Sequence, residues 1–202
     1  MLILKEDLTP FPALPQGIGH LRKSLPRIIE DLHNCLTLIQ RDTFSDMYRE
    51  LVDIDERVVK LERQLKVFVD NSEPCQRLLN APGFGFLSAT ALLATVGQAT
   101  CFKNGREMAA WLGIVPKQHS SGGKERLLGI SKRGDSYLRS LLIHGARSVL
   151  QYCWRKEDGR SRWLQRLADR RGPHKALVAQ ANKTARICWS ILARNEEYRS
   201  VA

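Results

Sequence analysis

The segment 117–134 places hydroxyl groups, glycines and cations close together in the sequence. Ser120 and Ser121 precede two glycines, and five basic residues lie in the same segment: Lys117, Lys124, Arg126, Lys132 and Arg133. A serine hydroxyl can attack a phosphorus atom, and nearby guanidinium and ammonium groups can neutralise the charge that develops on the phosphate oxygens. The same residue types also suit a loop that only binds an anion or faces solvent. The composition therefore leaves phosphoryl chemistry and simple anion binding both open.

A predicted helix follows this glycine-bearing loop. Asp135 is a favourable N-cap, and the helix is expected to reach about Trp154. Arg139 lies on a face of this helix that could return to the serine segment and contact DNA, and it also lies four residues after Asp135. It can equally form a surface ion pair with Asp135.

Residues 74–97 predict two short helices joined by a glycine turn. The first helix ends at Leu79, and Gly83 and Gly85 belong to the turn before an apolar, small-residue helix. This layout is typical of a helix–hairpin–helix, in which glycines let the backbone approach a DNA phosphate without reading bases. A plain helical hairpin fits the same pattern.

The clearest periodicity in the sequence is a heptad pattern over residues 44–68. The apolar residues alternate between spacings of three and four: Phe44, Met47, Leu51, Ile54, Val58, Leu61, Leu65 and Phe68. The pattern predicts a long coiled-coil helix with Thr43 as N-cap and Asp46 completing an imperfect capping box. Its apolar seam either packs against a preceding helix at 21–40, with Pro26 in the first turn, or joins two chains in a homo-oligomer.

The remaining pattern is helical throughout, so the predicted fold class is all-α. Further helices are expected at 106–112, 158–171 and 173–193, and the helix at 158–171 is basic and amphipathic. We expect an extended lead-in over 1–20, a coiled-coil-like helical hairpin over 21–72, and a compact helical domain over 73–202.

The charge of the 202-residue chain is unevenly distributed. Residues 1–70 carry 10 basic and 12 acidic residues, whereas residues 71–202 carry 22 basic and 9 acidic residues. Such a basic half most often faces a polyanion, usually nucleic acid, although a basic surface can also serve solubility alone. No stretch has the length and apolarity of a membrane span, and no signal peptide is recognisable. We expect a cytoplasmic protein with no membrane partner.

Two runs in the sequence resemble a known family. These are LLNAPGFGFLSATALLATVG at 78–97 and FKNGREMAAWLGIVPKQHSSGGKERLLGISKRGDSYLRSLLIHGAR at 102–147. They resemble the C-terminal transposase domain of insertion-sequence 110 elements, in the 1111-type subgroup. The run PQGIGHLRKSLPRIIED and the heptad helix are similar to that family's linker and coiled coil.

The resemblance implies DNA recombination through a serine nucleophile that forms a phosphoserine link with DNA, guided in some members by a structured RNA. On this sequence the nucleophile is Ser121, with Ser120 as the neighbouring candidate. The family's other half-site is an N-terminal ribonuclease-H-like domain whose carboxylates hold Mg²⁺. No such domain is recognisable here, so we expect a truncated copy that keeps DNA binding and itself binds no cofactor. The alternative is a non-catalytic remnant that binds nucleic acid or dimerises.

Overall fold

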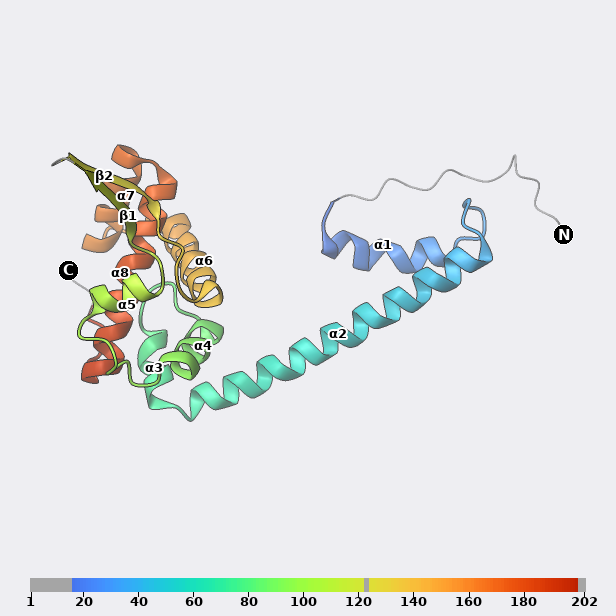
Figure 1. The fold of residues 1–202 in the computed structure, drawn as a ribbon. Coiled ribbons are helices and arrows are strands. Elements are labelled where there is room, and N and C mark those ends of the chain that lie inside the picture. Colours follow the sequence, from blue (N-terminus) through green and yellow to red (C-terminus); the bar gives the residue numbers. More distant parts are fainter. Residues whose placement is uncertain (1–15, 122–123, 200–202) are drawn as a thin grey trace. The chain divides into compact units, whose positions relative to one another are not determined.

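The computed structural model describes residues 16–121 and 124–199, and the side chains of residues 119–127 lie outside this description. Figure 1 shows the elements in chain order. They are α1 (Ile18–Glu30), α2 (Leu38–Asp70), α3 (Glu73–Leu79), α4 (Phe86–Val96), α5 (Gly105–Trp111), β1 (Pro116–Ser121), β2 (Lys124–Ile130), α6 (Ser136–Cys153), α7 (Gly159–Arg171) and α8 (Pro173–Arg194). The described residues confirm the all-α class, with one small two-stranded sheet added to it.

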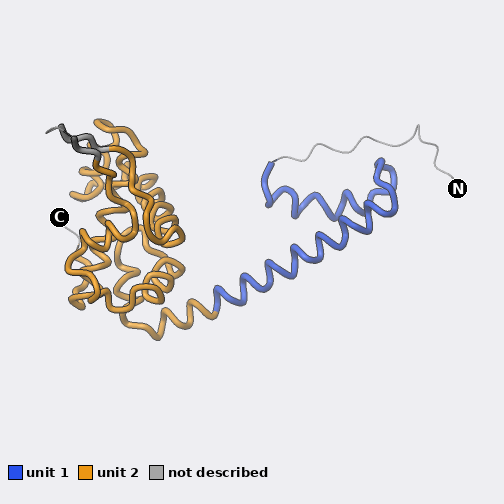
Figure 2. Tube along the Cα trace, in the orientation of Figure 1, with its two compact units in different colours: residues 1–63 blue, residues 64–202 orange. Residues whose placement is uncertain are grey.

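The chain divides into two compact units (Figure 2). Unit 1 is residues 1–63 and unit 2 is residues 64–202, so the division falls inside α2. The sequence pattern places a boundary slightly later, at 72, where α2 has ended. The packing of residues 64–70 therefore groups the last turns of α2 with unit 2.

In unit 1 the predicted helix at 21–40 is wrong at both ends. Helix α1 already begins at Ile18 and ends at Glu30, and a separate helix starts at Leu38. The turn between them is held by buried Asn34, whose side-chain amide donates to the Ile28 carbonyl at 2.6 Å. Arg41 donates to the Ile29 carbonyl at 2.6 Å and to the Asn34 side-chain oxygen at 2.5 Å. These side chains satisfy carbonyls that the end of α1 leaves free.

Pro26 lies inside α1 rather than in its first turn. A proline there cannot donate the N–H that would bond the Arg22 carbonyl one turn earlier. The hydroxyl of Tyr48, on α2, donates to that carbonyl at 3.4 Å, and the Arg22 side chain pairs with Asp55. Helix α2 therefore supplies the hydrogen bond to the Arg22 carbonyl that Pro26 cannot donate.

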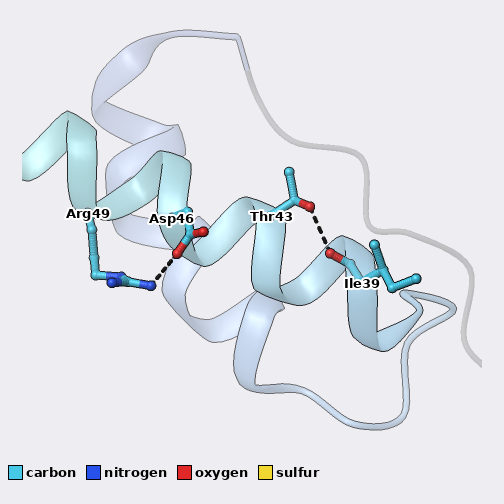
Figure 3. A network of polar contacts seen from close by, with 4 residues as sticks. All are labelled: Ile39, Thr43, Asp46 and Arg49. Atoms are coloured by element: carbon cyan, nitrogen blue, oxygen red, sulfur yellow. Dashed lines mark hydrogen bonds and ion pairs between the residues drawn. The ribbon is translucent and has the colours of Figure 1, made fainter.

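The start of α2 corrects the predicted N-cap. Thr43 lies in the second turn, where its hydroxyl donates to the Ile39 carbonyl at 2.8 Å, and Asp46 pairs with Arg49 (Figure 3). The capping box lies earlier: the Gln40 side chain accepts from the Thr37 N–H at 2.9 Å, and the Thr37 hydroxyl accepts from the Gln40 N–H at 3.3 Å. Two N–H groups at the start of the helix are thereby satisfied reciprocally.

The core of unit 2 is built around α8, which packs against α3, α5, α6 and α7. Its main cluster is apolar and almost fully buried, and includes Leu78, Leu92, Met108, Leu112, Ile114, Leu138 and Ile191. Two side chains of α8 tie connecting segments to this core. Trp189 donates its indole N–H to the Phe102 carbonyl at 3.1 Å, and Asn182 donates to the Ile114 carbonyl at 3.3 Å.

The segment expected to be a loop at 117–134 contains an antiparallel hairpin, so the prediction of a loop there is wrong. The register pairs Gln118 with Leu127 and Ser121 with Lys124, with an irregularity near Pro116. The sequence signal for this hairpin is the Gly-Gly pair between Ser121 and Lys124, which is typical of short hairpin connections. The alternating pattern expected of strands is absent because β1 is mostly polar, whereas β2 has its charged residues first and its apolar residues last.

Candidate nucleic-acid interface

The hairpin determines which residues share a face with each predicted nucleophile. Ser121 pairs with Lys124, and His119 pairs with Arg126. Successive strand residues alternate between faces, and paired residues lie on the same face. The positions of His119, Ser121, Lys124 and Arg126 therefore belong to one face of the hairpin.

Ser120 belongs to the opposite face. It pairs with Glu125, and the next pair on that face is Gln118 with Leu127. The register thus places a cationic position opposite Ser121 and an acidic position opposite Ser120. Since a phosphate is attracted to cations and repelled by a carboxylate, Ser121 has the more favourable position for phosphoryl chemistry.

Three further predicted cations lie near the base of the hairpin, where their side chains are described. Lys117 on β1 and Lys132 and Arg133 after β2 are all exposed. The Lys132 N–H donates to the Gly113 carbonyl at 3.1 Å, which ties the end of the hairpin to the segment before β1. Gly134 follows Arg133 with a positive φ of 92°, and a Cβ at this position would collide with the Trp111 carbonyl oxygen. The backbone around Lys132 and Arg133 is therefore closely held.

Arg139 has a different environment from the other predicted DNA contacts. It lies in the first turn of α6 and is partly buried, and one of its guanidinium nitrogens donates to the Leu112 carbonyl at 3.2 Å. The same nitrogen lies 3.5 Å from the carbonyl oxygens of Arg133 and Asp135. The Asp135 carboxylate instead caps α6 by accepting the Leu138 N–H at 2.8 Å, which confirms the predicted N-cap. Arg139 therefore braces the segment that presents Arg133.

The two glycines of the predicted helix–hairpin–helix differ in their surroundings. Helices α3 and α4 and the turn between them occur as expected, but Gly83 faces the protein. Its φ is 85°, and a Cβ there would lie 2.7 Å from the carbonyl oxygen of Gly145 on α6. Gly145 in turn has no room for a Cβ beside the Gly83 carbonyl. Glycine at 83 is thus explained by close backbone packing, which requires no DNA contact.

Gly85 is in open space. It is the N-cap of α4, no side chain caps this helix, and nothing lies within 4 Å of the position of its Cβ. The first N–H groups of a helix can receive a phosphate oxygen. The predicted phosphate contact is therefore better placed at Gly85, and its occurrence stays a prediction.

A further set of cations lies outside the predicted site residues. Helix α7 exposes Arg162, Arg166 and Arg170, which recur every fourth residue and so follow one helical face. Their signal in the sequence is the basic amphipathic pattern at 158–171. The pattern alone does not say which of its arginines are exposed. In the structure these three are exposed and so accessible to a polyanion, whereas Arg160 is buried.

The described residues offer neither a grouped metal site nor a membrane span. Within 16–121 and 124–199, no three His, Cys, Asp or Glu side chains are grouped so that they could hold a metal ion. No helix in that part of the chain has both the length and the apolar character required to cross a bilayer.

Comparisons with known proteins identify transposases as relatives. The chain is 51% identical over 159 residues to a probable family 20 transposase of Pseudomonas aeruginosa. This alignment covers 77% of the chain and 47% of the relative. It is 43% identical over 186 residues to the transposase for insertion sequence element IS1111A of Coxiella burnetii, covering 92% of this chain and 51% of the relative. The transposase for insertion sequence element IS1328 of Yersinia enterocolitica is 38% identical over 179 residues, with 89% and 53% covered.

The chain spans about half the length of these curated relatives. A family model described as the transposase IS116/IS110/IS902 family matches residues 75–162, a range that contains the glycine turn, the serine hairpin, α6 and the start of α7. Over this region the chain matches the IS116/IS110/IS902 family of transposases.

Proposed function

We propose that this chain binds DNA and supplies a serine nucleophile, Ser121, for the strand exchange of an insertion-sequence transposase. The observation that carries the assignment is the hairpin register, which puts Ser121 on the face of Lys124 and Arg126 and puts Ser120 opposite Glu125. The match to a transposase family and the basic character of residues 71–202 support DNA as the polyanion.

The proposed chemical step is a transesterification at a DNA phosphate. The Ser121 oxygen bonds to phosphorus as its proton departs, the bond from phosphorus to one deoxyribose oxygen breaks, and that oxygen takes up a proton. Lys124 and Arg126 offset the charge on the non-bridging oxygens during this exchange. The product is a phosphoserine link and a free DNA end. The described residues do not group carboxylates for Mg²⁺, so no part of this step is assigned to a metal held by them.

Self-association is a second part of the proposal. On α2 within unit 1, Met47, Ile54 and Leu61 are 59%, 46% and 58% exposed, and they recur every seventh residue. The contacts of α1 involve Arg41, Tyr48 and Asp55, which follow a neighbouring face. Helix α1 therefore leaves the Met47, Ile54 and Leu61 edge of the heptad stripe exposed, and a second copy of α2 has the matching apolar edge.

The nucleophile is tested by trapping. The chain is incubated with nicked duplex DNA carrying a labelled strand, and covalent adducts are resolved on a denaturing gel. We expect an adduct with the wild-type chain and with Ser120→Ala, and none with Ser121→Ala, while all three bind DNA equally before denaturation. An adduct that persists in Ser121→Ala and disappears in Ser120→Ala would reverse the assignment.

The alternative is a non-catalytic protein that binds nucleic acid or dimerises. It is favoured by the exposed cations at the base of the hairpin and on α7, which suit nucleic-acid binding without any catalysis. Salt-sensitive DNA binding with no adduct from any variant would support this alternative. Adding the family's structured RNA to the same reactions tests whether a guide is required.

A further inference from the structure

A pocket of about 880 Å³ lies on unit 2, away from the residues of the serine hairpin. It is formed where the start of α7 meets the last turns of α8 and the residues that follow α8. Its lining includes Arg160, Lys183, Ser190 and Tyr198. Neither the family comparison nor the proposed DNA chemistry assigns it a role.

Arg160 is the unusual residue of this pocket. Only 8% of the residue is exposed, although it carries a charged guanidinium. One terminal nitrogen donates to the Tyr198 hydroxyl at 3.3 Å, and the guanidinium carbon lies 5.6 Å from the centre of the Tyr198 ring. The other terminal nitrogen and Nε are buried without a hydrogen-bond partner. Buried charged donors are normally hydrogen-bonded, so these two nitrogens point to a missing acceptor.

Lys183 adds a second cation beside Arg160. Its ammonium nitrogen lies 4.5 Å from the centre of the Trp163 ring. The pKa of Lys183 is lowered first by burial and then by the positive charges of Arg160 and Arg186. Mutual repulsion between these cations is relieved by an anion placed between them.

The carboxylates around the pocket have other partners or are exposed. Asp158 accepts from the Ser161 hydroxyl at 2.6 Å and caps α7. Glu196 accepts a hydrogen bond from the Ser190 hydroxyl, and its other carboxylate oxygen lies 3.7 Å from a guanidinium nitrogen of Arg194. Glu197 lines the rim and is exposed. Among the described ion pairs, none joins a carboxylate to Arg160 or Lys183.

We propose that this pocket binds a phosphate group between Arg160 and Lys183. A tetrahedral phosphate offers several acceptor oxygens, so it can satisfy the free Nε and terminal nitrogen of Arg160 together, as the fork of a guanidinium favours. The ammonium of Lys183 supplies a further charge-assisted contact. The site is distinct from the serine hairpin, because the pocket is lined by α7, α8 and the residues after α8, and no hairpin residue with a described side chain is among them.

Inorganic phosphate is the probe for the first experiment. The 202-residue chain is titrated with phosphate at constant ionic strength, with chloride as the balancing anion, and binding is followed by NMR or calorimetry. We expect saturable binding that weakens at least about tenfold in Lys183→Met and in Arg160→Gln. Arg155→Gln removes an exposed arginine that lies five positions before Arg160, and this variant should bind phosphate as the wild type does.

Lys183→Met keeps the test decisive if removal of the buried Arg160 unfolds the protein, because Lys183 is only partly buried. Glu197→Gln should strengthen binding by removing a negative charge from the rim. A wild-type chain that shows no saturable response to phosphate would overturn the proposal. Equal weakening in Lys183→Met and Arg155→Gln would overturn it as well.

The source of the phosphate is distinguished by competition. A short DNA duplex without terminal phosphates is added to the phosphate-bound chain and to the Ser121→Ala variant. Displacement of phosphate in both assigns the site to the nucleic-acid backbone, whereas retention of phosphate while DNA binds elsewhere assigns it to a free phosphate ion. Phosphate binding by a chain that binds no DNA would reject the proposed function and leave this site supported.

Discussion

At the residue scale, Gly83 and Gly85 illustrate how the same amino acid serves different purposes two positions apart. Gly83 is required by a left-handed backbone and by the approach of Gly145. Gly85 has space around it and precedes a helix with no side-chain cap. Substitution of Gly83 should therefore change mainly the stability of the fold, and substitution of Gly85 should change mainly DNA binding.

We expect Gly83→Val to destabilise the protein by about 3 kcal/mol or more, because its side chain would meet the Gly145 backbone and its φ would be strained. Gly85→Val should cost only about 1 kcal/mol. Its DNA affinity should nevertheless fall about tenfold, because the β-branched side chain obstructs a phosphate at the start of α4. Urea unfolding and DNA-binding anisotropy measure the two effects.

The control for this pair is Gly19→Val on α1, which should leave DNA affinity unchanged, since Gly19 also has nothing within 4 Å of the position of its Cβ. Unchanged DNA affinity of Gly85→Val would show that the turn between α3 and α4 has only a structural role.

At the element scale, α2 donates hydrogen bonds to carbonyls that α1 leaves free, and it still exposes an apolar surface to a further partner. Tyr48 and Arg41 of α2 accommodate the constraints set by Pro26 and by the end of α1. Met47, Ile54 and Leu61 of the heptad stripe stay exposed beside this contact. An exposed apolar stripe with a seven-residue repeat favours association with another helix.

An acidic residue in this stripe should disrupt self-association. Ile54→Asp and Leu61→Asp are each expected to weaken dimerisation at least about tenfold, because each buries an unpaired carboxylate in the apolar seam. Val59→Asp is the matched control, since Val59 is similarly exposed but lies off the heptad. Sedimentation velocity at several concentrations measures the change. Equal behaviour of all three variants, or a wild-type chain that stays monomeric, would contradict the second part of the proposed function.

At the scale of the whole molecule, positive charge is concentrated in residues 71–202, whereas residues 1–70 are slightly acidic. The exposed cations of the hairpin base and of α7 belong to this basic part. Binding to DNA through such groups releases counterions, so affinity depends steeply on salt.

We expect DNA affinity to fall by on the order of a thousandfold between about 50 and 200 mM salt, as for proteins that contact six or more phosphates. Charge reversal at Lys132 or Arg133 should reduce the slope of log affinity against log salt by about 1 for each phosphate that the variant no longer neutralises. Arg57→Glu, in unit 1, should leave the slope unchanged. An affinity that does not vary with salt would leave a basic protein with no nucleic-acid role.

Local sequence signals predict much of the helical structure. Asp135 is an N-cap as expected, and the ends of α6, α7 and α8 lie within two residues of the expected positions. Periodicity and capping act over a few residues, so they can be recognised without knowledge of the fold. They fail at Thr43, because the capping box of Thr37 and Gln40 begins the helix earlier in the chain.

The sequence by itself determined the all-α class, the heptad repeat and the family resemblance, and it supplied the pair of serines proposed as nucleophile. Only the tertiary structure decided that Gly83 packs on Gly145, that Arg139 braces the hairpin base, and that Arg160 is buried with two unpaired nitrogens. These properties depend on contacts between residues that are distant in the sequence. Such contacts are set by packing of whole elements, whose effect on one side chain is not encoded in its immediate neighbours.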